Sequence, residues 1–167
     1  MKFFIKLTIL IYLISLKHVY AADVEISGTQ ATREDLQASS TLTISGTLDG
    51  DLNNIVRGYI AAGNEIDSAT VVVESGGTIQ GKSNAIMGRE TDSLTVINSG
   101  TIEATSSKAI QLLDAQNATI TNKSGGTIFA NTNAIVQQSA GTEDAENTTI
   151  TNAGTIYSVN DRAIYFY

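Results

Sequence analysis

The stretch TVINSGTIEATSSKAI, residues 95–110, holds three short motifs in a fixed order, and this order decides the fold. An alternating segment (95–97) comes first, Gly-Thr with an aliphatic residue (100–102) follows, and Ala109-Ile110 ends the unit. Short segments rich in Thr, Val and Ile that are bounded by Gly, Ser and Asn favour strands and turns. We therefore predict three short strands in this stretch.

The same three motifs recur five times along the chain, and each contributes one aliphatic residue per repeat. These residues form three columns: Leu42, Val71, Val96, Ile120 and Ile150 in the first; Leu48, Ile79, Ile102, Ile128 and Ile156 in the second; Ile55, Ile86, Ile110, Ile135 and Ile164 in the third. Side chains alternate faces along a strand, so the columns point inward and the flanking Thr and Ser point to solvent. One coil cannot bury its inner face alone, whereas stacked coils share one continuous core.

The repeats predict an all-β fold, a right-handed parallel β-helix of about five coils over residues 41–167. A helical solenoid would need amphipathic helices of about ten residues or more, and no such pattern follows Ser40. The right hand is expected by analogy with parallel crossover connections. Residues 22–40 contain one alternating segment, 23–26, and we expect them to form an N-terminal cap that covers the first coil.

The first residues predict export. Lys2 and Lys6 precede an uncharged apolar run (7–16), and small residues follow, so residues 1–21 are predicted to be a signal peptide cleaved between Ala21 and Ala22. A membrane-spanning helix needs about 20 apolar residues, which is longer than this run. We therefore expect a mature part that does not span a membrane.

The amino-acid composition limits the kinds of catalytic, metal and binding site that the chain can contain. The 167 residues include no Cys and a single His, His18, which lies inside the predicted signal peptide. Disulfides and thiolate metal sites are thus excluded, and the mature part lacks the side chain best suited to acid–base catalysis near neutral pH. The formal net charge of −7 argues against a nucleic-acid partner. No cofactor or metal is expected.

Two kinds of candidate site stand out. Asn98, Asn122 and Asn152 each follow the first strand of a repeat, and we interpret them as an internal ladder of stacked amides rather than a ligand-binding row. The segments 58–69 and 139–148 are longer than their counterparts in other repeats, so we expect surface loops that carry recognition. Their candidate recognition residues are Tyr59, Glu65, Asp67, Glu143, Asp144 and Glu146.

The leader and repeats such as 120–122, 126–128 and 134–135 resemble the passenger region of bacterial autotransporters, the pertactin-like β-helices. The resemblance covers nearly the whole mature chain. It implies export to the surface of a Gram-negative cell, with adhesion, contact with a host-surface molecule or self-association as the typical role. That family also carries a C-terminal membrane barrel, which residues 22–167 do not supply. We therefore expect a fragment, or a truncated product located in the periplasm or outside the cell.

The expected function is that of a non-catalytic structural or adhesive passenger. Two alternatives stay open. A polysaccharide lyase or hydrolase would use Asp49 and Asp51 with Arg57 nearby, although Asp-Gly-Asp is also an ordinary turn. An ice-binding β-helix would use the Thr-x-Thr rows, but Val72 and Ile97 interrupt them in the middle repeats.

Overall fold

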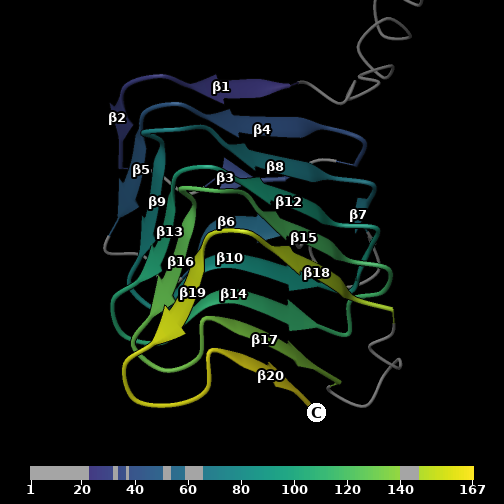
Figure 1. The fold of residues 1–167 in the computed structure, drawn as a ribbon. Coiled ribbons are helices and arrows are strands. Elements are labelled where there is room, and N and C mark those ends of the chain that lie inside the picture. The colour runs from purple at the N-terminus through teal and green to yellow at the C-terminus, as the bar shows by residue number, and fades with distance from the viewer. Residues whose placement is uncertain (1–22, 32–33, 37, 51–53, 59–65, 140–146) are drawn as a thin grey trace, which may run out of the picture.

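The computed structural model describes residues 23–31, 34–36, 38–50, 54–58, 66–139 and 147–167. The regular structure in these ranges is β-strand throughout, numbered β1 to β20 along the chain (Figure 1). Within them, no helix is long and apolar enough to cross a membrane.

Eighteen of the strands form three six-stranded parallel sheets, because each coil places one strand in each sheet. Sheet A contains β1 (Val24–Ile26), β4 (Thr41–Ile44), β8 (Thr70–Val73), β12 (Thr95–Asn98), β15 (Thr119–Asn122) and β18 (Thr149–Asn152). Sheet B contains β2 (Thr29–Gln30), β5 (Thr47–Gly50), β9 (Thr78–Gly81), β13 (Thr101–Ala104), β16 (Thr127–Ala130) and β19 (Thr155–Ser158). Sheet C contains β3 (Glu34–Asp35), β6 (Asn54–Gly58), β10 (Asn84–Arg89), β14 (Lys108–Leu113), β17 (Ile135–Gln138) and β20 (Ile164–Phe166).

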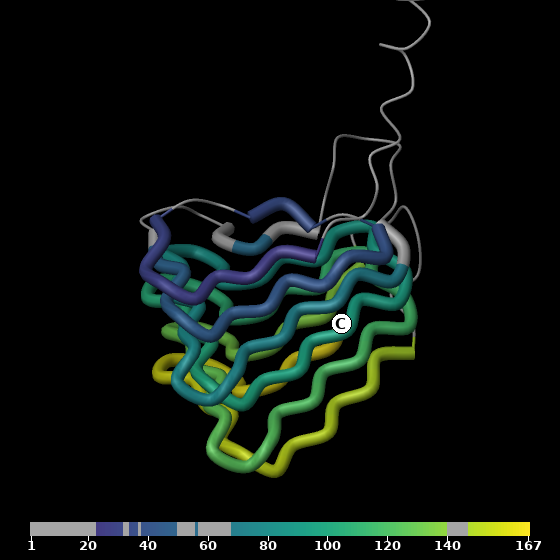
Figure 2. The backbone as a smooth tube through the Cα atoms, turned by 90° about the horizontal axis from the view of Figure 1, so that it is seen from above, coloured from purple at the N-terminus to yellow at the C-terminus, as the bar shows by residue number. Residues whose placement is uncertain are grey.

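The stacking confirms the predicted parallel β-helix. Equivalent residues of successive coils lie side by side, as Ile79, Ile102, Ile128 and Ile156 do in sheet B. Figure 2 shows the coils in chain order from the N-terminal to the C-terminal end of the stack. The five predicted repeats each supply one strand to every sheet, and the sixth strand of each sheet comes from β1, β2 and β3. The segment predicted as a cap thus continues the repeat at the N-terminal end, while the right hand of the coil stays a prediction.

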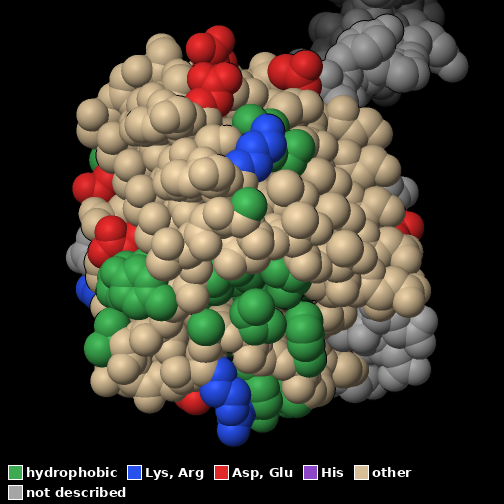
Figure 3. All heavy atoms as spheres, in the orientation of Figure 1, with side chains coloured by type: hydrophobic (Ala, Val, Ile, Leu, Met, Phe, Trp, Pro, Cys, Tyr) green, Lys and Arg blue, Asp and Glu red, His purple; other side chains and the backbone are tan. Residues whose placement is uncertain are grey.

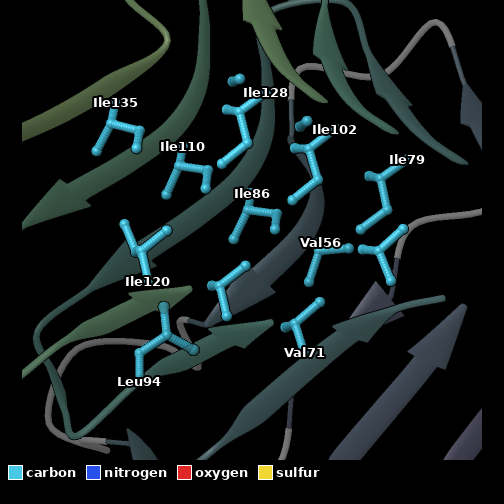
Figure 4. Packing of buried hydrophobic residues seen from close by; sticks show 14 of the residues in the cluster. Val56, Val71, Ile79, Ile86, Leu94, Ile102, Ile110, Ile120, Ile128 and Ile135 are labelled. Carbon is cyan, nitrogen blue, oxygen red and sulfur yellow. The ribbon is translucent and has the colours of Figure 1, made fainter. Parts of the chain in front are cut away.

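The three inner faces share one core (Figure 4). Val71, Ile79 and Ile86 come from three different sheets, and none of them is exposed to solvent. Burying one such side chain contributes about 1.5–3 kcal/mol relative to leaving it in water. Four successive coils each add three aliphatic residues from the columns to this interior, from Leu42, Leu48 and Val56 in the first of them to Ile120, Ile128 and Ile135 in the last.

One member of the third column was predicted wrongly. Val56, not Ile55, is in register with Ile86, and Asn54 pairs with Asn84. Val56 is fully buried in the core. Ile55 and Val56 are adjacent and both aliphatic, so the motif alone left the register uncertain by one residue; a shift of one residue exchanges the two faces of a strand.

The expected loop 58–69 contains regular structure. β7 (Ile66–Asp67) pairs in parallel with β11 (Thr91–Asp92), and these two strands form a small fourth sheet between sheets C and A. An isolated bridge from Asp92 to Gln116 extends the same arrangement into the next coil. The prediction of an irregular loop was therefore wrong for residues 66–67.

The Gly of each Gly-Thr motif lies where two coils approach closely. A Cβ on Gly100 would lie 2.2 Å from the carbonyl oxygen of Gly77 and 2.4 Å from that of Glu74. No real side chain tolerates such contacts with backbone, so only glycine fits. The short distance between neighbouring coils therefore explains why the motif contains Gly at this position.

The turn before each strand of sheet A from β4 to β18 contains a residue in the left-handed conformation. In five successive coils, the residue two positions before the first Thr has a positive φ. Asn and Ser adopt this conformation more easily than most residues because their side chains bond to the nearby backbone. The residues and φ values are Ser39 (56°), Ser68 (60°), Ser93 (61°), Asn117 (51°) and Asn147 (58°).

Candidate functional site

The asparagine ladder runs along the end of sheet A. Asn98 donates from Nδ2 to Oδ1 of Asn122 at 2.8 Å, and Asn122 donates in the same way to Asn152 at 2.8 Å. Asn98 and Asn122 are fully buried, whereas Asn152 is exposed in the last coil. The row occupies the column that Ile44 and Val73 fill in earlier coils.

The ladder amides also serve the backbone. Nδ2 of Asn122 lies 3.2 Å from the carbonyl of Gly126 and 3.1 Å from that of Thr155. Oδ1 of Asn98 accepts from the amide of Gly100 at 3.2 Å, which holds the turn into sheet B. Buried polar groups need such partners. With these bonds made inside the stack, the buried amides face no solvent and suit a structural role.

The predicted recognition residues lie largely outside the described part. Tyr59, Glu65, Glu143, Asp144 and Glu146 are not among the described residues, and neither are the predicted cleavage residues Ala21 and Ala22. The backbone of Asp67 is described, in β7, where it pairs with Asp92. The proposed recognition role of these residues stays a prediction.

A second polar row, absent from the sequence analysis, lies on the surface at the left-handed corner. Nδ2 of Asn117 donates to Oδ1 of Asp92 at 2.9 Å, and Nδ2 of Asn147 approaches Oδ1 of Asn117 at 3.4 Å. Ser93 also donates to Oδ1 of Asp92, at 3.1 Å. In the sequence, the available signal for this row was an Asn two residues before the first Thr of a strand. That signal does not show that the side chains meet, because they come from different repeats and are brought together only by stacking.

The outer face of sheet A carries two columns of uncharged side chains. Its first column consists of Thr in five coils, namely Thr41, Thr70, Thr95, Thr119 and Thr149. The second column reads Thr43, Val72, Ile97, Thr121 and Thr151. The outward positions of these five strands thus hold no charged residue. The Thr-x-Thr pattern required for ice binding is interrupted in the two middle coils.

The residues of the catalytic alternative lie on different sheets. Asp49 belongs to β5 of sheet B and is in register with Gln80, while Arg57 belongs to β6 of sheet C and is in register with Met87. Asp51 falls outside the described residues. No group of three His, Cys, Asp or Glu side chains in the described part of the chain is arranged to hold a metal ion.

Aromatic rings gather in the last two coils, another feature that the motifs did not indicate. Phe129 and Tyr157 stack with ring centroids 4.5 Å apart on the outer face of sheet B. Tyr165 and Tyr167 stack at 4.7 Å, and the guanidinium of Arg162 lies 4.2 Å from the Tyr165 ring. These contacts strengthen the packing of the final coil.

The fold places the chain in the class of parallel β-solenoid proteins. No protein-family model matches it, and neither the curated proteins nor the solved structures contain a significant match. A fold of this class defines a scaffold, and its function depends on the surfaces that the scaffold presents.

Proposed function

We propose that the chain is an exported, non-catalytic β-solenoid that acts by surface contact, as an adhesive or structural passenger segment of the autotransporter type. The observation that supports this role is the outer face of sheet A. Its ten outward positions from β4 to β18 contain eight Thr with Val72 and Ile97, and no charge. An uncharged, regular face on a chain with a net charge of −7 is suited to contact with another surface.

The composition of this face favours adhesion over chemistry. Thr offers a hydroxyl and a methyl group in the same side chain, so a column of Thr both forms hydrogen bonds and covers apolar area. The column is repeated at the strand spacing, about 4.8 Å, over five coils. Many weak, equally spaced contacts of this kind give binding to an extended partner through multivalency.

The test is adherence of cells that display the chain, expressed with its own leader ahead of a membrane-anchoring domain, to host-cell monolayers and to each other. Thr95→Glu with Thr119→Glu adds charge to the outer face of sheet A. The matched control, Thr101→Glu with Thr127→Glu, adds the same charge to the equivalent Thr column of sheet B. We expect display to raise adherence, and the sheet A variant alone to abolish the gain.

Two results contradict the proposal. One is adherence by displaying cells no greater than that of cells with the empty anchor, when antibody labelling of intact cells shows the chain at the surface. The other is an equal loss of adherence in the sheet A and sheet B variants, which would mean that the outer face of sheet A is not the specific contact surface. Release of reducing ends or unsaturated sugars from polysaccharides by the purified chain would support the catalytic alternative instead.

A further inference from the structure

The chain contains three copies of the sequence Asn-x-Ser/Thr with a residue other than Pro in the middle, at 117–119, 122–124 and 147–149. In exported proteins this motif is the acceptor for N-linked sugars, provided that its Asn lies at the surface. All three copies fall within the described residues. The fold therefore decides which of them can carry a sugar.

Two of the copies begin at the left-handed turn before sheet A. Asn117 precedes β15 and Asn147 precedes β18, and both side chains are exposed. The Thr of each motif, Thr119 or Thr149, is the first residue of the strand and lies in the outer column of sheet A. Figure 3 shows mainly side chains that are neither hydrophobic nor charged along the right edge, where the strands of sheet A begin. Both motifs thus lie on the outside of the stack.

The third copy is closed by the fold. Asn122 is fully buried, and its Nδ2 donates to Oδ1 of Asn152 at 2.8 Å and lies 3.2 Å from the carbonyl oxygen of Gly126. A sugar on this nitrogen would occupy the place of the next coil. The chain therefore contains an internal control, the same motif at a position that the stack hides.

The turn itself does not require Asn. In three other coils a Ser occupies this position in the same left-handed conformation: Ser39, Ser68 and Ser93. Asn117 and Asn147 add an amide whose Nδ2 lies 2.9 Å from Oδ1 of Asp92 in the first case and 3.4 Å from Oδ1 of Asn117 in the second. A primary amide nitrogen carries two hydrogens, so replacing one by a sugar leaves the other for such a bond.

We propose that Asn117 and Asn147 are acceptors for an N-linked sugar and that Asn122 is not. The donor is a sugar whose anomeric carbon is esterified to a diphosphate, on a nucleotide or a lipid carrier, and a glycosyltransferase of the producing cell catalyses the transfer. Nδ2 forms a bond to the anomeric carbon and gives up one proton to a base of the transferase. The bond from that carbon to the diphosphate oxygen breaks, and the diphosphate leaves with the bonding electrons.

The proposal rests on the export part of the proposed function, because the motif serves as an acceptor in exported chains. It does not depend on an adhesive role. The two are measured separately: cell fractionation locates the chain, and its mass shows whether it is modified. A glycosylated chain found only inside the cell would contradict export alone.

The test is the mass of the full chain, purified from the cells that produce it naturally, followed by analysis of its tryptic peptides. Cleavage after Lys123 places Asn117 and Asn147 on different peptides. Fragmentation that keeps the sugar attached distinguishes Asn117 from Asn122, which share a peptide. We expect sugar on Asn117 and Asn147 and none on Asn122. A single monosaccharide indicates the nucleotide donor, and an oligosaccharide of fixed composition indicates the lipid carrier.

Variants separate the motif from the side chain that carries it. Thr119→Ala keeps Asn117 and is expected to lose the sugar there, whereas Thr119→Ser retains the hydroxyl and is expected to keep it. Ser93→Asn creates the motif with Thr95 at the same turn of the preceding coil, and is expected to add a third sugar. Circular dichroism of each variant shows whether the stack is preserved.

A chain of unmodified mass in every cell fraction would overturn the proposal. Sugar on Asn122 would overturn it too, because the fold would then not select the acceptor. So would a Thr119→Ala chain that keeps the sugar on Asn117, or a folded Ser93→Asn chain that gains none.

Discussion

At the scale of single residues, the interior of the stack changes character between β8 and β12. The column that holds Ile44 and Val73 continues with Asn98 and Asn122. Each buried amide forms hydrogen bonds to the amide of the next coil and to the turn into sheet B. The polar atoms of this column therefore have partners inside the stack. Removing one amide breaks the hydrogen bonds that it makes to its neighbours and to the backbone inside the stack, and an unsatisfied buried polar group costs about 1–3 kcal/mol.

Asn122→Leu is therefore expected to lower the free energy of unfolding by about 1–3 kcal/mol. Asn122 lies in the middle of the ladder, where Asn98 donates to it and it donates to Asn152. Asn152→Leu, at the exposed end, should cost less because solvent replaces the lost bonds. Urea unfolding followed by circular dichroism measures both; equal losses would refute the view of a buried, cooperative ladder.

Gly100→Ala tests the close approach of coils. The added Cβ would meet the carbonyl oxygen of Gly77 at 2.2 Å, so the coils must separate locally, at a cost of about 2–3 kcal/mol. Gly28→Ala is the matched control, because no atom lies within 4 Å of its Cβ position. Thermal unfolding should show a lower melting temperature for the first variant and little change for the second. A small effect at Gly100 would mean that the coils are more loosely stacked than described.

At the scale of strands, β12 shows how alternation separates the core from the surface. Val96 is fully buried, and its neighbour Ile97 lies in the outer column of sheet A. Val96→Thr is expected to cost about 1–3 kcal/mol because it places a hydroxyl in the core. Ile97→Thr should change stability by no more than about 0.5 kcal/mol. Chemical denaturation of the two variants compares them, and the reverse order of effects would show that the strand is turned the other way.

The sequence was sufficient to predict the strands that recur in every repeat. The first two columns were predicted from the motifs alone, because every member is aliphatic and directly follows the Thr of its motif. The third column failed at Val56, where two adjacent aliphatic residues fit the motif equally well. β7 and β11 were missed because two-residue strands show no periodicity.

At the scale of the whole molecule, the features that sequence reasoning missed are those that stacking creates. Asp92, Asn117 and Asn147 lie in different repeats and meet only in the folded stack. The positions of Asn98, Asn122 and Asn152 were readable from the sequence because the same motif precedes each of them.

The stacking of like residues over like is the central claim, and a distance between two spin labels tests it most directly. The chain has no Cys, so a pair of introduced Cys residues can be labelled without interference. Thr43→Cys with Thr151→Cys places labels on one outer column of sheet A, four coils apart. Dilution with unlabelled chain removes distances between molecules. Pulsed electron resonance should give about 19 Å between the labelled sites, four times the strand spacing; a separation beyond about 30 Å would contradict the stack.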